Sequence, residues 1–289
     1  MTSLATNPPA THPLMGFARD CWRHRTARYA LLTLFILAVL AVLSPHIAPY
    51  DPYETRILDS MLPPSAEHWM GTDLAGRDIF SRILTGARIS LVIGLFAVAI
   101  SVTVGCTIGL ISGYYGGRLD NIVMRLIDVM MSFPGVLLAM SIVAVLGTGL
   151  VNVIIAVGIG GITEFARVSR GSVLAIKEEV YVDAARATGC SDLRIIFRHV
   201  LPNAFPPILV LASMSYGWAL LSATGLSFLG LGAAPPASEW GAMLSDGRNV
   251  MWDAPWAAIF PGIAILITVL ASNLLGDAIR DIIDPKIKV

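Results

Sequence analysis

Six long stretches of the chain contain no Asp, Glu, Lys or Arg, and polar segments separate them. Five of the six are close to the roughly 20 residues that a helix needs to cross the hydrocarbon core of a bilayer. The other is shorter, but its helix can continue past Glu164 toward Arg167 if these side chains reach the headgroups. The stretches cover residues 29–48, 89–112, 129–147, 149–163, 204–224 and 257–275. This pattern predicts an all-α integral membrane protein with six transmembrane helices.

The composition supports the same class. Hydrophobic residues make up 55% of the chain, charged residues only 14%, and the mean hydropathy is +0.72. These values are typical of a protein whose surface is largely in contact with membrane lipid. The formal net charge is zero, so charge gives no reason to expect a nucleic-acid partner.

The basic residues predict the orientation. Six spans put both termini on one side, and basic residues near span ends are retained in the cytoplasm. If the termini are cytoplasmic, 15 of the 20 Lys and Arg residues lie inside. The first span lacks a small-residue cleavage site and is expected to be retained. The predicted parts are a cytoplasmic tail (1–28), a first transmembrane helix (29–48), an extracytoplasmic loop (49–88), a five-span core (89–279) and a cytoplasmic tail (280–289).

A polar segment, residues 177–202, separates the fourth and fifth spans on the predicted cytoplasmic side. Its first part is rich in Ala, Glu and Arg, which favour a helix, and Gly189 suits the left-handed residue that ends one. Pro202 is expected to end a second helix that begins near Ser191. The segment is therefore expected to form two short helices joined by a sharp turn.

This segment reads Asp183-Ala184-Ala185, then Gly189, then His199-Val200-Leu201-Pro202. It resembles the coupling motif of bacterial ABC importer permeases, in which a Glu stands at position 183 and an Ile at position 199. The resemblance implies two cytoplasmic coupling helices that dock on ATPase subunits. The structural alternative is a helical hairpin with ordinary cap residues. The residues assigned to coupling are Tyr181, Asp183, Ala184, Ala185, Gly189, Leu201 and Pro202.

The predicted extracytoplasmic loop contains Gly71-Thr72-Asp73 and Gly76-Arg77-Asp78, followed by Ser81-Arg82 and Gly86. Ile79, Ile83 and Leu84 would share one helical face, which predicts an amphipathic helix on the membrane surface. These short motifs resemble a signature of the second membrane subunit in the peptide and nickel subfamily of ABC importer permeases. A structural collar is the favoured role, and contact with the transported solute is the alternative.

A second external segment, residues 226–256, resembles the same subfamily, and the whole resemblance covers residues 65–285. Trp240, Trp252 and Trp256 are expected to be interfacial anchors, with docking of a binding protein as the alternative. Small residues repeat within the spans and predict closely packed helices. They are Gly105, Gly109 and Gly113 in the second span and Gly158, Gly160 and Gly161 in the fourth.

The chain lacks the residues that ATP hydrolysis, ion-coupled transport or metal binding would require. The chain has no Gly-Lys pair, so it has no phosphate-binding loop of the ATPase type. The six spans hold no ionisable side chain except His46 at one end, which argues against an ion-coupled carrier. Cys21, Cys106 and Cys190 show no metal-binding spacing. No cofactor, metal site or catalytic group is expected in this chain; ATP and Mg²⁺ would bind to partner ATPase subunits.

These observations and the resemblance together predict one half of the transmembrane channel of an ABC importer in the bacterial inner membrane. The resemblance implies a five-helix permease core preceded by one N-terminal helix. It also implies a related second permease subunit, two ATPase subunits and an extracytoplasmic binding protein. The solute would be a peptide or a nickel complex. A stand-alone secondary transporter or channel, and a structural or assembly protein, remain the alternatives.

Overall fold

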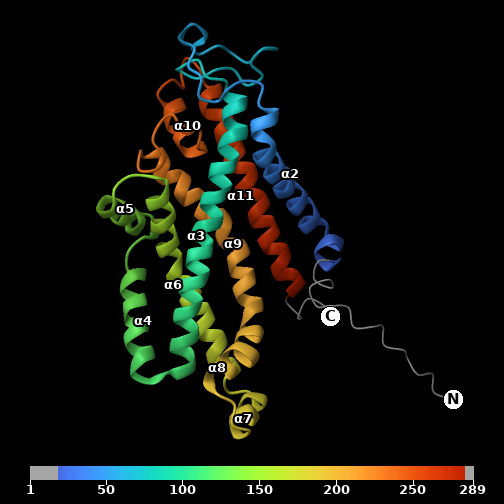
Figure 1. Ribbon diagram of the computed structural model, residues 1–289, viewed down its shortest axis with the longest axis vertical. Helices are drawn as coiled ribbons and strands as arrows, with labels where there is room; N and C mark the ends of the chain where they lie inside the picture. The colour runs from blue at the N-terminus through green and yellow to red at the C-terminus, as the bar shows by residue number, and fades with distance from the viewer. Residues whose placement is uncertain (1–18, 284–289) are drawn as a thin grey trace, which may run out of the picture.

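The computed structural model describes residues 19–283, which are mostly helical and contain no strand. Five helices are long and apolar enough to cross a membrane: α2 (Arg25–Ile47), α3 (Ile79–Tyr115), α6 (Leu150–Ile176), α9 (Leu201–Phe228) with the residues before it from Asp192, and α11 (Trp256–Ile283). They lie side by side in one elongated bundle (Figure 1). The all-α class is therefore confirmed. Residues 1–18 and 284–289, which make up most of the two predicted tails, lie outside the described residues. The helices extend into the described parts of the tails, since α2 begins at Arg25 and α11 ends at Ile283.

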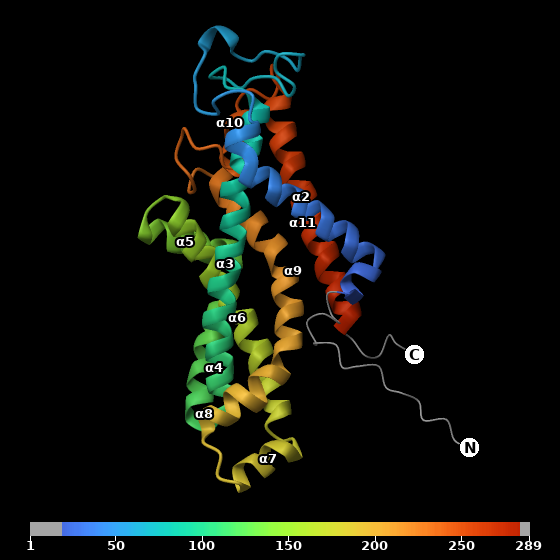
Figure 2. The same cartoon turned by 45° about the vertical axis from the view of Figure 1, so that its right-hand side comes forward.

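The predicted third span, residues 129–147, is not one helix. Its residues are divided between α4 (Gly117–Met131) and α5 (Gly135–Leu146), which meet at 94°. Pro134 has no backbone N–H and disfavours the helical conformation of Phe133, so the helix ends before it. As a result α5 points sideways, away from the bundle (Figures 1 and 2).

The prediction of an amphipathic helix on the membrane surface, with Ile79, Ile83 and Leu84 on one face, is also wrong. Residues 79–88 form the first turns of α3, which continues without a break to Tyr115. Asp78 caps this helix, since its Oδ2 accepts a hydrogen bond from the Ser81 backbone N–H at 2.8 Å. Ile79 and Leu84 are buried against the neighbouring elements instead of facing lipid.

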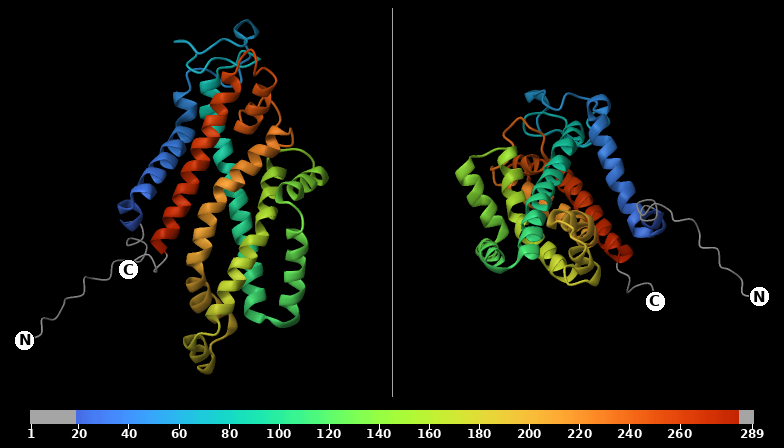
Figure 3. Two further views of the ribbon diagram at one scale, coloured as in Figure 1. Left: turned by 180° about the vertical axis from the view of Figure 1, so that it is seen from behind. Right: turned by 60° about the horizontal axis from the view of Figure 1, so that its bottom comes forward.

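The pair formed by α3 and α6 is the centre of the bundle, and small residues allow its close packing. A Cβ atom at Gly105 would lie 2.7 Å from the Ile162 carbonyl oxygen, and one at Gly109 only 2.4 Å from that of Ala166. The Ser101 hydroxyl also donates to the Gly158 carbonyl at 2.7 Å. The close approach predicted for these glycine-rich helices is confirmed. At the edge of the bundle, α2 packs against α11 (Figure 3).

The molecule has two functional ends. The coupling end carries α7 (Val180–Ala187) and α8 (Asp192–Ile195), and the loop end carries residues 48–78 and α10 (Trp240–Arg248) (Figure 2). At the loop end Trp240 is fully buried, and its indole donates to the Ile83 carbonyl at 3.1 Å. It is therefore a core residue and not the predicted interfacial anchor. Trp256 donates to the Thr72 carbonyl, whereas Trp252 is almost fully exposed.

Candidate coupling site

The turn between α7 and α8 depends on Gly189, whose φ is +81°. A side chain is disfavoured in this left-handed conformation, so glycine is the residue that fits. The turn is closed by two backbone bonds, from Gly189 N–H to the Arg186 carbonyl and from Cys190 N–H to that of Ala185. The predicted helix, sharp turn and second helix are confirmed at this position.

The predicted end of the second helix at Pro202 is wrong. The π-helical segment η2 (Ile196–Val200) follows α8 directly and leads into α9. Pro202 lies in the first turn of α9, where the fixed φ of proline suits a helix and a missing N–H is tolerated. The coupling end is therefore connected to the membrane by a continuous helical path.

One face of α7 is buried and the other is open. Val182 and Ala185 pack in a cluster with Val173 and Ile195, whereas Asp183 and Ala184 are exposed. Ala185 was expected to face a partner groove, and the structure corrects this, because its side chain supports α7 from within. The remaining predicted residues divide similarly: Tyr181, Gly189 and Pro202 are exposed, and Leu201 is half-buried.

The open face carries an ion pair and a side-chain hydrogen bond to Tyr181. The Arg186 guanidinium donates to the Asp183 carboxylate at 3.0 Å, with both side chains largely exposed. Asn203 donates its side-chain amide to the Tyr181 hydroxyl at 3.1 Å and to the His199 carbonyl at 2.6 Å. Asn203 therefore links the start of α9 to α7 by a hydrogen bond.

A second link joins the coupling end to α3, and the sequence analysis missed it. The buried Tyr114 hydroxyl, in the last turn of α3, donates to the Asp192 carboxylate at 2.7 Å. The Arg186 guanidinium lies 5.8 Å from the centre of the same ring. Tyr114 is far from the motif in sequence, and the nearby glycines at every fourth position, which end at Gly113, indicated only a closely packed helix.

Ion pairs fix α6, the helix that precedes the coupling segment, to α4. Arg170 makes a two-pronged bond to Asp120, in which its Nε donates at 2.6 Å, and Arg167 pairs with Asp128 at 2.6 Å. The first pair is largely buried and the second is half-exposed. Lys177 completes the set by donating its Nζ to the Gly113 carbonyl of α3 at 3.2 Å. The base of the coupling segment is thus held by two helices.

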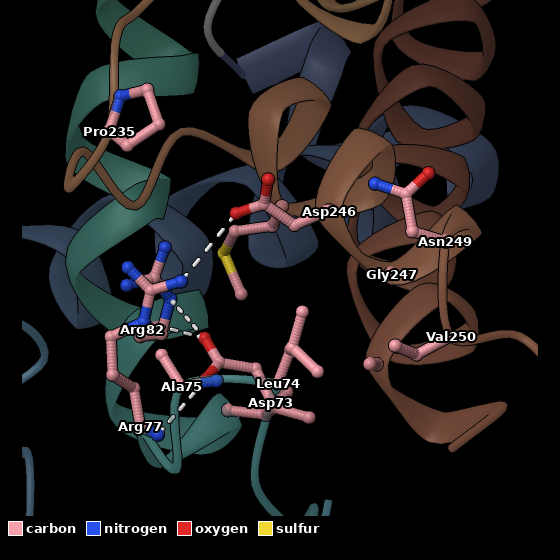
Figure 4. A pocket seen from close by; sticks show the side chains of 13 residues that line it. Asp73, Leu74, Ala75, Arg77, Arg82, Pro235, Asp246, Gly247, Asn249 and Val250 are labelled. Carbon is pink, nitrogen blue, oxygen red and sulfur yellow. Dashed lines mark hydrogen bonds and ion pairs between the residues drawn. The ribbon is translucent and has the colours of Figure 1, made fainter. Parts of the chain in front are cut away.

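At the loop end, the polar residues Asp73, Arg77 and Arg82 of the predicted loop line a cavity of about 260 Å³, together with residues of α10 (Figure 4). Arg77 pairs with Asp73 at 2.7 Å and lies 3.5 Å from Asp246 of α10. Arg82 is 1% exposed and donates to the carbonyls of Pro52 at 3.1 Å and Ala237 at 3.3 Å. Burial raises the pKa of Asp246. These bonds tie three distant segments together, which supports the collar interpretation over contact with solute.

Comparison with known proteins identifies the family. Residues 105–289 match the model described as "Binding-protein-dependent transport system inner membrane component". The chain belongs to this family of permeases. Residues 15–64 of this permease also match the N-terminal TM domain of oligopeptide transport permease C. Both matches confirm the resemblance inferred from the motifs, including the peptide and nickel subfamily.

Similar curated proteins cover nearly the whole permease. The glutathione transport system permease protein GsiD of Pectobacterium atrosepticum is 47% identical over 277 residues, which are 96% of this chain and 92% of the relative. GsiD of Escherichia coli O6:K15:H31 is 49% identical, with 96% and 91% covered. This permease is therefore a multi-span subunit of an ABC importer of the bacterial inner membrane. Permeases of this kind work with ATPase and binding-protein partners.

Two solved structures share the fold. The MetNI methionine ABC transporter in inward facing conformations has a TM-score of 0.57 and 18% identity, and the match covers 71% of this chain and 97% of that chain. An amino acid ABC transporter gives a TM-score of 0.50 with 18% identity and covers 70% and 94%. At this identity the likeness concerns the fold alone.

Proposed function

We propose that this permease imports glutathione or a closely related short peptide. The observation that carries the proposal is the 47–49% identity to glutathione transport permeases over 96% of the chain. The complex would contain a related second permease, two ATPase subunits and an extracytoplasmic solute-binding protein. ATP and Mg²⁺ would be held by the ATPases, and this chain would contribute no catalytic group.

In this arrangement the coupling end and both termini face the cytoplasm, and the loop end faces outward. The distribution of Lys and Arg supports this orientation, since most of them lie at the coupling end and in the tails. The orientation also places the open face of α7 where a soluble ATPase can reach it.

The exposed face of α7 would dock in a groove of the ATPase. Ala184 allows close approach, and the Asp183 carboxylate offers charge for recognition. When the ATPase pair closes on ATP, α7 would move with it. The movement would pass to α3 through Tyr114 and Asp192, and to α9 through Asn203. Tyr181, Gly189, Leu201 and Pro202 would maintain the shape of this joint, and the result would be alternating access.

A pair of alanine substitutions tests the docking face. Ala184→Trp places a large side chain on the exposed face of α7, whereas Ala175→Trp makes the same change at an exposed position of α6 outside it. We expect ATP-driven uptake of radiolabelled glutathione by the reconstituted complex to fall at least tenfold with Ala184→Trp and to stay near wild type with Ala175→Trp. Equal uptake by the two variants would contradict the docking role.

The energy source is tested in the same vesicles. Uptake should require enclosed ATP and should continue when an uncoupler collapses the proton gradient, because the spans lack ionisable groups that could couple to protons. Uptake by the isolated chain driven by a proton gradient alone would instead support the secondary-transporter alternative.

A further inference from the structure

Two adjacent large apolar side chains at the loop end, Ile57 and Leu58, are strongly exposed, and the pair is here called the η1 knob. These residues form the first two positions of η1 (Ile57–Asp59) and are 79% and 98% exposed. They belong to the light-blue loop that extends beyond the helices at the top of the molecule (Figures 1 and 2). Adjacent large apolar side chains with this exposure form a small apolar patch, and such patches mark contact sites for other molecules.

The backbone around the η1 knob is fixed by hydrogen bonds on both sides. Arg56 N–H donates to the Ala75 carbonyl at 3.1 Å, and the Ser60 hydroxyl donates to the Leu74 carbonyl at 2.7 Å. The carbonyl of Asp59 accepts the Thr72 hydroxyl. The knob is therefore presented in a defined conformation and does not belong to a loop that could turn its apolar residues inward.

Two unfavourable backbone features lie next to the η1 knob and hold it in its exposed conformation. Met61, three residues after Leu58, has φ of +55° and is the one non-glycine residue of the described range 19–283 with a positive φ. Such a conformation is unfavourable for a side chain and persists where surrounding contacts enforce it. On the other side, a Cβ atom at Gly76 would lie 1.8 Å from the Arg56 carbonyl oxygen, so glycine is required for the contact that supports the knob.

Lipid is an unsuitable occupant for the knob. The 37 residues of α3 extend over about 55 Å, whereas the hydrocarbon core is about 30 Å thick. The charge-free part of α3 begins after Arg88, so residues 79–88 project about 15 Å beyond it. The loop with the η1 knob lies beyond the start of α3, past the headgroup region. A protein surface outside the membrane is therefore the kind of occupant that suits the knob.

The surroundings of the knob have the composition of a protein interface. Arg56 and Glu54 form an ion pair at 3.1 Å with both side chains about half-exposed, and Asp51 is also exposed. An apolar centre within a polar, solvated rim is the usual anatomy of a docking surface. Large apolar side chains at such a centre carry much of the binding energy when they enter a pocket.

We propose that the η1 knob docks into an apolar pocket on the solute-binding protein. This inference rests on the proposed function, which places the loop end outside the membrane where that protein delivers solute. The knob would form the centre of a larger contact, since two side chains alone are too small for a specific interface.

The test replaces the knob with small polar residues in the intact importer. Ile57→Ser with Leu58→Ser removes the apolar surface, and the matched control, Ile57→Leu with Leu58→Met, retains it. The complex in lipid nanodiscs is titrated with the purified, fluorescently labelled solute-binding protein of the same importer. We expect the Kd to rise at least tenfold for the serine variant and to stay within about twofold for the control. Basal ATP hydrolysis without binding protein and the melting temperature should be unchanged, because both side chains are exposed.

The outcomes separate this inference from the proposed function. If the wild-type complex responds to the binding protein and the serine variant binds it with the same Kd, the η1 knob is not the docking element, although the importer function stands. Loss of the second permease subunit from the serine variant at unchanged Kd would also overturn the inference and would assign the knob to the subunit interface. If the wild-type complex shows neither stimulated ATP hydrolysis nor peptide uptake, the proposed function itself fails.

Discussion

Substitution of Gly109 by alanine is the sharpest test of the packing between α3 and α6. The added Cβ would lie 2.0 Å from the Ser169 hydroxyl oxygen and 2.4 Å from the Ala166 carbonyl oxygen. The hydroxyl can rotate away. The carbonyl belongs to the backbone of α6, so the two helices must separate by about 1 Å to restore an ordinary contact.

Two opposing effects determine how much Gly109→Ala changes the free energy of unfolding. Alanine is favoured over glycine inside a helix by about 1 kcal/mol, whereas overpacking a close contact costs about 1–3 kcal/mol. Gly171→Ala isolates the first effect, because Gly171 lies inside α6 and a Cβ there meets nothing within 4 Å. The difference between the two variants is therefore the overpacking cost, about 1–3 kcal/mol in favour of Gly171→Ala.

The measurement is the free energy of unfolding of the purified permease in mixed micelles, together with ATP-driven uptake by the reconstituted complex. Gly109→Ala should lower both quantities, whereas Gly171→Ala should raise the free energy of unfolding by about 1 kcal/mol and leave uptake unchanged. Equal unfolding free energies for the two variants would refute the close approach of α3 and α6 at this point.

Three further predictions concern other contacts. Tyr114→Phe removes a hydrogen bond to a charged acceptor, worth about 1.5–3 kcal/mol; the number of ATP molecules hydrolysed per solute imported should rise, and an unchanged ratio would remove Tyr114 from the coupling path. Asp120→Asn should lower the free energy of unfolding by about 1 kcal/mol, whereas Asp128→Asn, in a half-exposed pair, should change it by less than about 0.5 kcal/mol. Burial raises the pKa of Glu239, so the folded chain binds this proton more tightly than the unfolded chain, and stability should fall as pH rises from the ordinary glutamate pKa through the raised value. Glu239→Gln should flatten that dependence in a pH series of melting temperatures.

The membrane-spanning helices could be predicted from the sequence because a bilayer imposes a length and an absence of charge. Pro134 permits a kink, but the 94° change of direction between α4 and α5 could not be predicted, because hydropathy carries no information about direction and the apolar run continues through Phe133 and Pro134. The charges of α4 likewise gave no sign of their partners. Asp120 could be matched to Arg170 only when the two helices were placed side by side.

The coupling motif was recognised because its residues are close together in sequence, and Gly189 was placed correctly because a left-handed turn limits the choice of residue. Tyr114 was missed because its contact with Asp192 depends on the tertiary arrangement. Trp240 was misassigned for a related reason. Tryptophan is common at membrane interfaces, and only the structure shows that its indole is buried and bonded to the Ile83 carbonyl.

The arrangement of α3 limits where the molecule can bend during transport. This helix is continuous from its Asp78 cap at the loop end to Tyr114 at the coupling end, and close packing with α6 stiffens it. We therefore expect a movement at α7 to reach the loop end as a displacement of the α3–α6 pair. By contrast, α9 begins at the π-helical segment η2 and contains Pro206 and Pro207, which are features at which helices bend. We expect the angle between the α3–α6 pair and α9 to change during alternating access, because this is the joint in the described part of the core where the backbone hydrogen-bond pattern is interrupted and both helices contact the coupling segment.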